Sequence, residues 1–238
     1  MEEKTDLSEK NILLTGGGSG MGEATALALA KSGANVAIVG RRMATLTSTL
    51  AKVQPVGKIL AKEADVTDRK SLDGLFQWFD GEVGTLDYLV HAAGVNVALR
   101  SMQELSPDDW DQLIETNLTG SYNIIRLTLE RMRIQKKGLI ILINSVAGKR
   151  SAPLAGIGYN ASKFGMTGLG IGLAEEEKIH GIRISNLYPG EVNTPILNNR
   201  KQPPSEEHRQ TILQVEDIAS VILYLCQLPE RVHVPELV

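Results

Sequence analysis

The chain contains little cysteine and few aromatic residues, and each shortage excludes a class of protein. Cys226 is the only cysteine among 238 residues, so an intramolecular disulfide and a cysteine-ligated metal cluster are excluded, and no metal site is expected. We expect Cys226 itself to be a small buried apolar side chain in a helix. Aromatic residues make up 4% of the chain, and they form no platform for stacking the bases of a nucleic acid.

Long apolar runs and an excess of positive charge are also missing. No apolar stretch approaches the roughly 18 residues that cross a bilayer. The N-terminal sequence Met-Glu-Glu-Lys-Thr-Asp lacks the basic and then apolar pattern of a signal peptide. The formal net charge of −3 provides no electrostatic footprint for nucleic acid or an anionic membrane. We therefore expect a cytoplasmic protein with neither a nucleic-acid nor a membrane partner.

What the chain does contain is a regular alternation of two kinds of segment. Short aliphatic or β-branched runs predict strands at Asn11–Thr15, Asn35–Val39, Gly57–Ala61, Leu86–His91, Gly138–Asn144, Ile182–Tyr188 and Val232–Val238. Segments with helical periodicity predict helices between them, at Met21–Ser32, Arg42–Val53, Arg69–Glu82, Pro107–Arg133, Tyr159–His180 and Val215–Leu228. Because parallel strands need long crossovers, this order predicts an α/β fold with a doubly wound parallel sheet and helices on both faces. We expect a single domain over residues 1–238.

A glycine-rich turn follows the first predicted strand directly. Its sequence is Thr-Gly-Gly-Gly-Ser-Gly-Met-Gly, and an Ala- and Leu-rich helix comes after it. Residues without a Cβ allow a tight turn, and the backbone N–H groups at the start of a helix attract a pyrophosphate. This context predicts a dinucleotide site, with a glycine loop that binds no ligand as the alternative. The residues expected to contact the dinucleotide are Gly16, Gly18, Ser19, Gly20, Met21 and Gly22.

The residues after the second predicted strand favour NADP over NAD. Folds that prefer NAD commonly place an acidic residue there to accept a hydrogen bond from the ribose 2′-OH, but this chain has Arg41 and Arg42. Two guanidinium groups suit a 2′-phosphate. The alternative is that both arginines are solvated residues at the start of the next helix. After the third strand, Asp65 and Val66 are expected at the adenine edge, with an ordinary turn carboxylate as the alternative.

Tyr159 and Lys163 are four positions apart in a predicted helix, so the phenol and the ammonium lie on one face. A phenol with an ordinary pKa near 10 is a weak base at neutral pH, but a neighbouring lysine and an oxidised nicotinamide both favour the phenolate. The pair therefore predicts a tyrosine that transfers a proton. Taken alone, the spacing is common in helices, where an interfacial aromatic beside a solvated lysine is the alternative.

The glycine turn and the Tyr159/Lys163 pair occur together with further motifs, and the motifs follow one another along the sequence in a recognisable order. The sequence contains Gly16/Gly20/Gly22, His91-Ala92-Ala93-Gly94, Asn117, Ser145, Tyr159/Lys163 and Pro189-Gly190. In this pattern the chain resembles the short-chain dehydrogenase/reductase family, in its shorter single-domain branch, over essentially its whole length. The resemblance implies a Rossmann-type fold and hydride transfer between NADP and a small-molecule carbonyl or alcohol of the ketone, aldehyde or 3-oxoacyl type. A dinucleotide-binding sensor or scaffold without catalysis is the alternative.

The resemblance also implies a role for each matched position. Tyr159 would donate or accept the proton, and Lys163 would bind the nicotinamide ribose and lower the pKa of the phenol. Ser145 would hold the substrate oxygen, and Asn117 would anchor a water in the same proton relay. Besides Tyr159 and Lys163, the further cofactor contacts implied by the resemblance are Ala92, Ala93, Gly94, Pro189, Gly190, Val192 and Thr194.

The chain departs from the family pattern at His91, where relatives usually have asparagine, and we interpret His91 as structural and not as a catalytic base. The polar segment Asn198–Arg209 is expected to form an active-site lid, with a linker as the alternative. A homodimer or homotetramer is expected, because the resemblance implies an interface on the helices at Pro107–Arg133 and Tyr159–His180. The second of these helices carries four glycines that suit close packing, Gly165, Gly168, Gly170 and Gly172.

Overall fold

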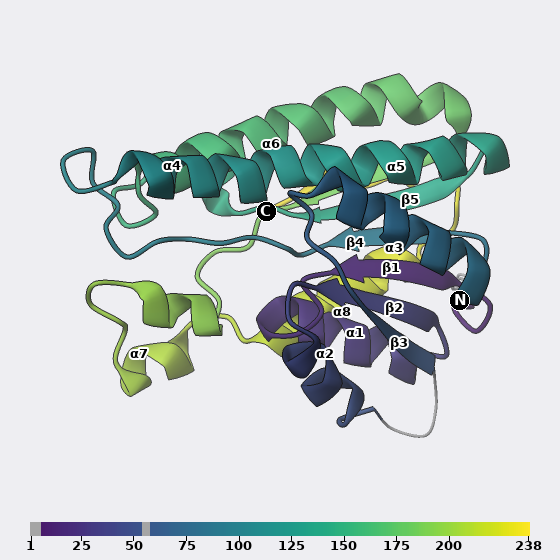
Figure 1. Ribbon diagram of the computed structural model, residues 1–238, viewed down its shortest axis with the longest axis horizontal. Coiled ribbons are helices and arrows are strands. Elements are labelled where there is room, and N and C mark those ends of the chain that lie inside the picture. The colour runs from purple at the N-terminus through teal and green to yellow at the C-terminus, as the bar shows by residue number, and fades with distance from the viewer. Residues whose placement is uncertain (1–5, 54–57) are drawn as a thin grey trace.

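Seven parallel strands form one central sheet in the computed structural model, which describes residues 6–53 and 58–238. The strands are β1 (Asn11–Thr15), β2 (Asn35–Gly40), β3 (Lys58–Glu63), β4 (Tyr88–His91), β5 (Gly138–Ile143), β6 (Ile182–Leu187) and β7 (Glu236–Leu237). Their order across the sheet is β3-β2-β1-β4-β5-β6-β7 (Figure 1). The order reverses between β1 and β4, and in such sheets ligands bind at this switch point beyond the carboxyl ends of the strands. The predicted Rossmann-type fold is confirmed.

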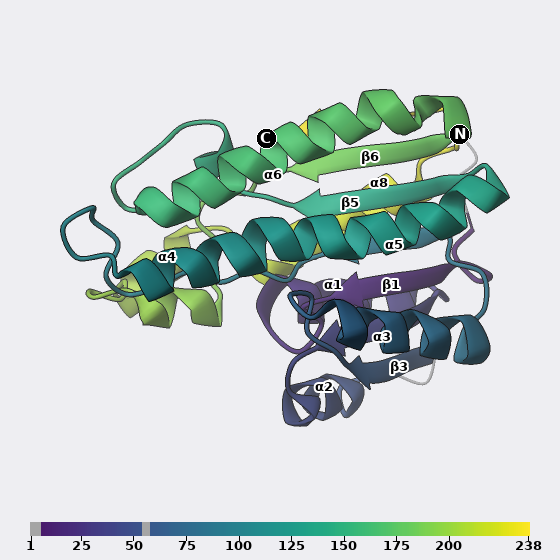
Figure 2. The same cartoon turned by 45° about the horizontal axis from the view of Figure 1, so that its top comes forward.

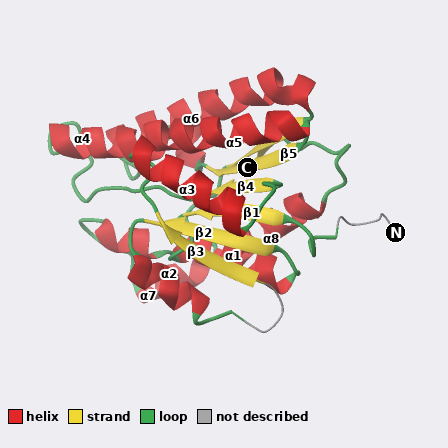
Figure 3. Cartoon of the chain, turned by 45° about the vertical axis from the view of Figure 1, so that its right-hand side comes forward, coloured by secondary structure: helices red, strands yellow, loops and turns green. Residues whose placement is uncertain are grey.

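Helices cover both faces of the sheet, as Figures 2 and 3 show. The helices are α1 (Gly20–Lys31), α2 (Met43–Leu50), α3 (Arg69–Glu82), α4 (Pro107–Ile114), α5 (Gly120–Gln135), α6 (Ile157–Glu176), α7 (Glu206–Thr211) and α8 (Val215–Gln227). The alternation of side chains along β1 builds two cores. Ile12 and Leu14 join the core under α1 and α8, whereas Leu13 joins the core under α3 and α5. Both faces of the strand are buried, which is why its sequence reads as a continuous apolar run.

Most predicted elements are present with bounds that differ by one or two residues. The last strand is much shorter than predicted, because only Glu236–Leu237 pairs with β6. Gly57, the first residue of the third predicted strand, lies outside the described residues, and β3 runs on to Glu63. The helix predicted to open at Tyr159 begins earlier, at Ile157, after Gly156 with a φ of +89°. Among the described helices, none combines the length and apolarity needed to cross a membrane.

The prediction of one regular helix over Pro107–Arg133 was wrong. The helix begins at Pro107, as predicted, and is capped by Ser106, whose hydroxyl accepts a hydrogen bond from the Asp109 N–H at 3.1 Å. A π-helical turn at Glu115–Thr119 then separates α4 from α5. A π-turn adds one residue to the helical repeat, and such turns occur frequently at functional sites. Asn117 lies in the middle of this turn.

Residues 198–209 lie beyond the carboxyl ends of the strands in two different views (Figures 1 and 2). They include the end of a 3-10 turn at Pro195–Asn199 and the start of the short helix α7. The segment is tied to the body of the protein: Arg209 donates to Asn193 Oδ1 at 3.1 Å, and His208 pairs with Glu191 at 2.8 Å. Its position is compatible with the predicted lid, which stays a prediction.

Candidate active site

The glycine-rich turn between β1 and α1 is too crowded for larger residues at two positions. Gly16 has a φ of +74°, and a Cβ there would stand 2.9 Å from the backbone of Ala92 and Ala93. A Cβ on Gly22 would stand 2.2 Å from the carbonyl oxygen of Gly16. The turn is fixed to β2, because the N–H groups of Gly16 and Gly17 both donate to Val39 O. The close approach of Gly22 to Gly16 places the start of α1 directly against the end of β1.

Ser145 and Tyr159 come from different elements and meet in one place. Ser145 follows the end of β5, where its hydroxyl accepts a hydrogen bond from the Ala147 N–H at 3.1 Å. Tyr159 lies in the first turn of α6, and its phenol is close enough to the Ser145 hydroxyl for that group to lower its pKa. The two hydroxyl groups that the sequence pattern selected therefore line the same cavity.

Burial and nearby groups act on the pKa of Tyr159 in opposite directions. Burial raises the pKa of the phenol above its ordinary value, while the hydrogen bond from Ser145 and the positive charge of Arg100 lower it. Lys163 lies one turn further along α6, with its Nζ 5.7 Å from the centre of the Tyr159 ring. It is 3% exposed, and burial lowers the pKa of its ammonium to about 8. The alternative of a solvated surface lysine is therefore wrong.

Lys163 and Asn117 approach each other beside Gly94. Lys163 Nζ donates to Ile143 O at 3.0 Å. A Cβ placed on Gly94 would stand 3.4 Å from Asn117 Oδ1 and 3.9 Å from Lys163 Nζ. The amide of Asn117 is held by Val95, since Nδ2 donates to its carbonyl at 3.0 Å and Oδ1 accepts from its N–H at 2.8 Å. The π-turn thus fixes Asn117 within reach of the catalytic candidates.

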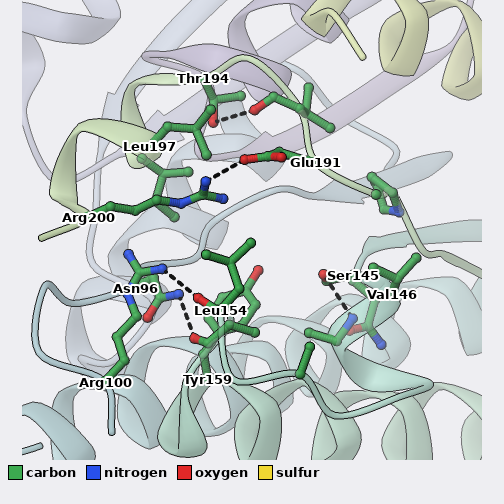
Figure 4. A pocket seen from close by; sticks show the side chains of 18 of the residues that line it. Asn96, Arg100, Ser145, Val146, Leu154, Tyr159, Glu191, Thr194, Leu197 and Arg200 are labelled. Carbon is green, nitrogen blue, oxygen red and sulfur yellow. Dashed lines mark hydrogen bonds and ion pairs between the residues drawn. The ribbon is translucent and has the colours of Figure 1, made fainter. Parts of the chain in front are cut away.

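A cavity of about 280 Å³ opens over Ser145 and Tyr159 (Figure 4). Of the residues predicted to contact the cofactor, six line this cavity: Met21, Tyr159, Pro189, Gly190, Val192 and Thr194. The sequence did not single out Asn96, Arg100, Leu154, Leu197 and Arg200, which also line it. They belong to loops, and a loop sequence without periodicity carries no signal for the pocket that it joins.

A second hollow, of about 120 Å³, lies at the ends of β1, β2 and β3. It brings together Gly16, Arg41, Asp65, Val66, Ala93 and Gly94, six of the predicted cofactor residues. Arg42 does not line it; this residue precedes α2 as its N-terminal cap and is exposed. Asp65 also closes a local turn, with Oδ1 accepting from the N–H and the hydroxyl of Thr67, both at 2.9 Å.

His91 is fully buried between two hydroxyl groups. Its Nδ1 lies 2.7 Å from Thr15 Oγ1, and its Nε2 lies 2.9 Å from Ser121 Oγ. Ser121 donates its one proton to the Asn117 carbonyl at 2.7 Å, so it accepts from His91 Nε2–H. The neutral ring then accepts from Thr15 through Nδ1. His91 thus links the end of β1 to the π-turn of Asn117, a link that depends on Ser121, which the sequence analysis missed.

The burial of His91 predicts a loss of stability at acidic pH. Burial and the charge of Lys163 lower the pKa of His91 from 6.5 to about 3. The unfolded chain therefore binds a proton below about pH 6.5 that the folded chain does not, and the stabilising contribution declines as pH falls from there toward 3. The slope for one such group is about 1.4 kcal/mol per pH unit. Urea unfolding at pH 7 and 5 is expected to show a smaller decrease for His91→Asn than for the wild type, by about 2 kcal/mol. Parallel decreases in the two proteins would contradict this assignment.

Comparison with known proteins identifies the family. Residues 10–205 match the family model of short chain dehydrogenases. The chain belongs to the short-chain dehydrogenase family. This short-chain dehydrogenase is therefore an NAD(P)-dependent oxidoreductase. Among the described residues, no group of histidine, cysteine and acidic side chains is arranged to hold a metal ion.

Two curated relatives resemble the chain along nearly its whole length. It is 34% identical to the glycine betaine reductase ATRR of Emericella nidulans over 98% of its own length, but it spans only 19% of that relative. It is 31% identical to an uncharacterized oxidoreductase of Listeria innocua, with 97% of this chain and 95% of the relative covered.

Two solved structures show the same similarity. Levodione reductase superposes with a TM-score of 0.89 at 28% identity, covering 98% of this short-chain dehydrogenase and 96% of that chain. A single-residue variant of actinorhodin polyketide ketoreductase, solved with NADPH, superposes with a TM-score of 0.88 at 26% identity and coverages of 95% and 94%.

Proposed function

We propose that this short-chain dehydrogenase interconverts a carbonyl and an alcohol with NADP(H), and that residues 1–238 act as one catalytic domain. The observation that carries the proposal is the position of the Tyr159 phenol near the hydroxyl of Ser145 in the lining of one cavity. Lys163 is buried one helical turn away, close to Asn117. A phenol, a hydroxyl and an ammonium in this arrangement can hold an oxygen and move a proton to it.

The chemistry divides between the cofactor and the chain. The bound nicotinamide supplies or accepts the hydride. In the reducing direction, Ser145 hydrogen-bonds to the carbonyl oxygen, which becomes negatively charged as the hydride arrives. Tyr159 then donates its proton to this oxygen, and the positive charge of Lys163 stabilises the phenolate that remains. In the oxidising direction, the phenolate of Tyr159 accepts the same proton.

We propose that Asn117 anchors a water that returns the proton. Its two amide protons are already donated to Val95 O and Ser162 Oγ. Its side-chain oxygen accepts one hydrogen bond, from the Val95 N–H, and its main-chain carbonyl oxygen accepts one from the Ser121 hydroxyl. Because a carbonyl oxygen has two lone pairs, the side-chain oxygen retains an acceptor position for a water beside Gly94, where Lys163 Nζ also lies. His91 would act by holding this turn in place and not as a base.

The residues around the two hollows fit a dinucleotide. The glycine turn leaves no room for a Cβ on Gly16 or Gly22, which suits a close approach of the backbone to a pyrophosphate. Arg41 lines the second hollow and is the arginine that we propose for the 2′-phosphate. The similar ketoreductase was solved with NADPH, which supports the same cofactor here.

The cofactor proposal is tested by titrating the protein with NADPH and NADH. We expect Arg41→Asp to lower the affinity for NADPH by about 30-fold, because it removes a charge-assisted contact to the 2′-phosphate. Arg42→Asp is the matched control, and its effect is expected to be within about threefold, because Arg42 is exposed and does not line the hollow. Equal affinities of the wild type for NADPH and NADH would contradict the proposal.

Adding a panel of ketones and aldehydes to the NADPH complex tests the reaction. Consumption of NADPH that follows the added carbonyl supports the proposed enzyme. Tight binding of NADPH without turnover of any carbonyl would favour the alternative of a sensor or scaffold.

We propose a homodimer or homotetramer that forms through the outer faces of α5 and α6. Tyr122, Phe164 and Ile171 expose 46%, 45% and 41% of their side chains there. Gly168 and Gly172 leave open space on α6, whereas Gly165 and Gly170 are packed against Leu118 and Asn186 within the chain. Exposed apolar side chains beside open glycines suit close contact with a second copy.

A further inference from the structure

Three arginines line the cavity over Tyr159. Arg150 is exposed, whereas Arg100 and Arg200, which come from separate loops, are partly buried. In Figure 4 both lie on the same side of the cavity as Asn96, and Ser145 lies on the opposite side. The two positive charges are close enough that Arg200 lowers the pKa of Arg100. Arg100 in turn acts on Tyr159, whose pKa it lowers. The reactive phenol therefore stands between Ser145 and a positively charged end of the cavity.

Arg200 is neutralised by an acidic partner. Its Nη1 forms an ion pair with Glu191 Oε1, and the other oxygen of Glu191 pairs with His208 at 2.8 Å. These two contacts hold the pKa of Glu191 below its ordinary value. Glu191 is therefore ionised at neutral pH and balances Arg200.

Arg100 has no such partner. Its Nε donates to Val97 O, and its Nη1 donates to Leu154 O at 3.1 Å. These acceptors are neutral carbonyls, and they use two of the five N–H groups of the guanidinium. No carboxylate of the described residues forms an ion pair with Arg100, and burial lowers its pKa. Against the one carboxylate of Glu191, the two partly buried guanidinium groups leave one positive charge uncompensated, which is an unfavourable state without a bound anion.

We infer that Arg100 binds an anionic group of the substrate, and that the protein acts on oxo acids or hydroxy acids in preference to neutral ketones and alcohols. This inference rests on the proposed function, because it places the anion beside the carbonyl that Ser145 and Tyr159 hold. The planar guanidinium offers parallel N–H groups that match the two oxygens of a carboxylate. The backbone contacts to Val97 and Leu154 fix the guanidinium in the cavity wall before the substrate arrives, so little entropy is lost on binding.

The kinetic test compares each acid with its neutral ester. Reduction of 2-, 3- and 4-oxo acids and of their methyl esters is measured with saturating NADPH. For at least one chain length, we expect the wild type to prefer the acid over the ester by about 30-fold in kcat/KM. Arg100→Gln, which keeps polar contacts but loses the charge, is expected to bring the two rates within about threefold of each other.

Two further variants separate charge recognition from the contact between loops. Arg100→Lys keeps the positive charge but lacks the two parallel N–H groups of the guanidinium. It is therefore expected to retain a preference for the acid that Arg100→Gln loses. Arg131→Gln is the matched control, because Arg131 pairs with Asp80 on the outer surface, away from the cavity. It is expected to keep the full preference. A wild type that reduces acids and esters equally well, or an Arg100→Gln variant that still prefers acids, would overturn the inference.

A binding measurement decides the inference even without turnover. Calorimetric titration of the NADPH complex with butanoate and with methyl butanoate uses unreactive ligands. The wild type is expected to bind butanoate more tightly than the ester, and Arg100→Gln is expected to lose this difference. Reduction of neutral ketones without any preference for the anion would overturn the substrate class and leave the proposed function standing. Selective butanoate binding without reduction of any carbonyl would support the anion site and contradict the proposed function.

Discussion

Replacing Tyr159 by phenylalanine is expected to lower kcat/KM for carbonyl reduction by about 1,000-fold. The substitution removes one hydroxyl group and retains the ring that lines the cavity. Without this hydroxyl, the oxygen held by Ser145 has no acid to protonate it as the hydride arrives. Steady-state rates measured with NADPH, together with a separate titration of NADPH binding, check the prediction. The dissociation constant for NADPH is expected to change by no more than about threefold, since proton transfer contributes nothing to cofactor binding.

Tyr122→Phe is the matched control for this prediction. Tyr122 lies on the exposed face of α5 with 46% of its surface accessible, so removal of its hydroxyl is expected to leave the rate unchanged. A Tyr159→Phe variant with a rate within about tenfold of the wild type would show that another group donates the proton.

Replacing Gly22 by alanine is expected to destabilise the protein by about 3 kcal/mol and to weaken NADPH binding by at least about tenfold. The new Cβ would stand 2.2 Å from the Gly16 carbonyl oxygen. The position of the Cβ is fixed by the backbone of residue 22 and the oxygen is a backbone atom, so no side-chain rotation relieves the clash. The first turn of α1 must therefore move away from β1, which displaces the N–H groups that we propose for the pyrophosphate. Urea unfolding and an NADPH titration measure the two effects.

Gly74→Ala is the matched control, because it makes the same substitution inside α3, where nothing lies within 4 Å of the new Cβ. Alanine in a helix interior is more stable than glycine by roughly 0.5–1 kcal/mol, so this variant is expected to be as stable as the wild type or more stable. If Gly22→Ala matched Gly74→Ala in stability and in NADPH affinity, the close approach of α1 to β1 would be wrong.

The sequence predicted the arrangement of the sheet because its signals are local. The apolar run Asn11–Thr15, the glycine turn and the Ala-rich helix after it follow one another without a gap, and each has its own backbone requirement. The approach of Ser145 to Tyr159 joins the residues after strand β5 to the first turn of helix α6, across an irregular loop. No local pattern predicts this approach, and only the family resemblance joined the two residues.

The π-turn at Glu115–Thr119 could not be predicted from periodicity. The turn spans only five residues, and the segments on both sides of it each fit a helical period, so together they read as one helix. The turn is defined by tertiary contacts instead, such as those from Asn117 to Val95 and Ser162. The prediction of a long last strand failed for a related reason, because Val232–Val238 is apolar enough for a strand but pairs with β6 only at its end.

The functional importance of an arginine could be predicted from the sequence only where the fold defines its position. Arg41 was identified because it occupies a defined position after β2, where the fold places a cofactor contact. Arg100 and Arg200 lie in loops, and their importance depends on which charge stands beside each of them. Only the structure shows that Glu191 pairs with Arg200, whereas the hydrogen bonds from Arg100 go to backbone carbonyls.

The hydrogen bonds from Thr15 through His91 to Ser121 restrict how this part of the sequence can change. Thr15 donates to His91, His91 donates to Ser121, and Ser121 donates to the Asn117 carbonyl. Each of these groups has one proton to donate, so the hydrogen bonds all run in the same direction. A replacement at one position leaves its neighbours buried with an unpaired hydroxyl or nitrogen, at a cost of about 1–3 kcal/mol each. Substitutions at Thr15, His91 and Ser121 are therefore expected to be coupled. A relative with a shorter amide in place of His91 needs other hydrogen-bond partners for the two hydroxyl groups.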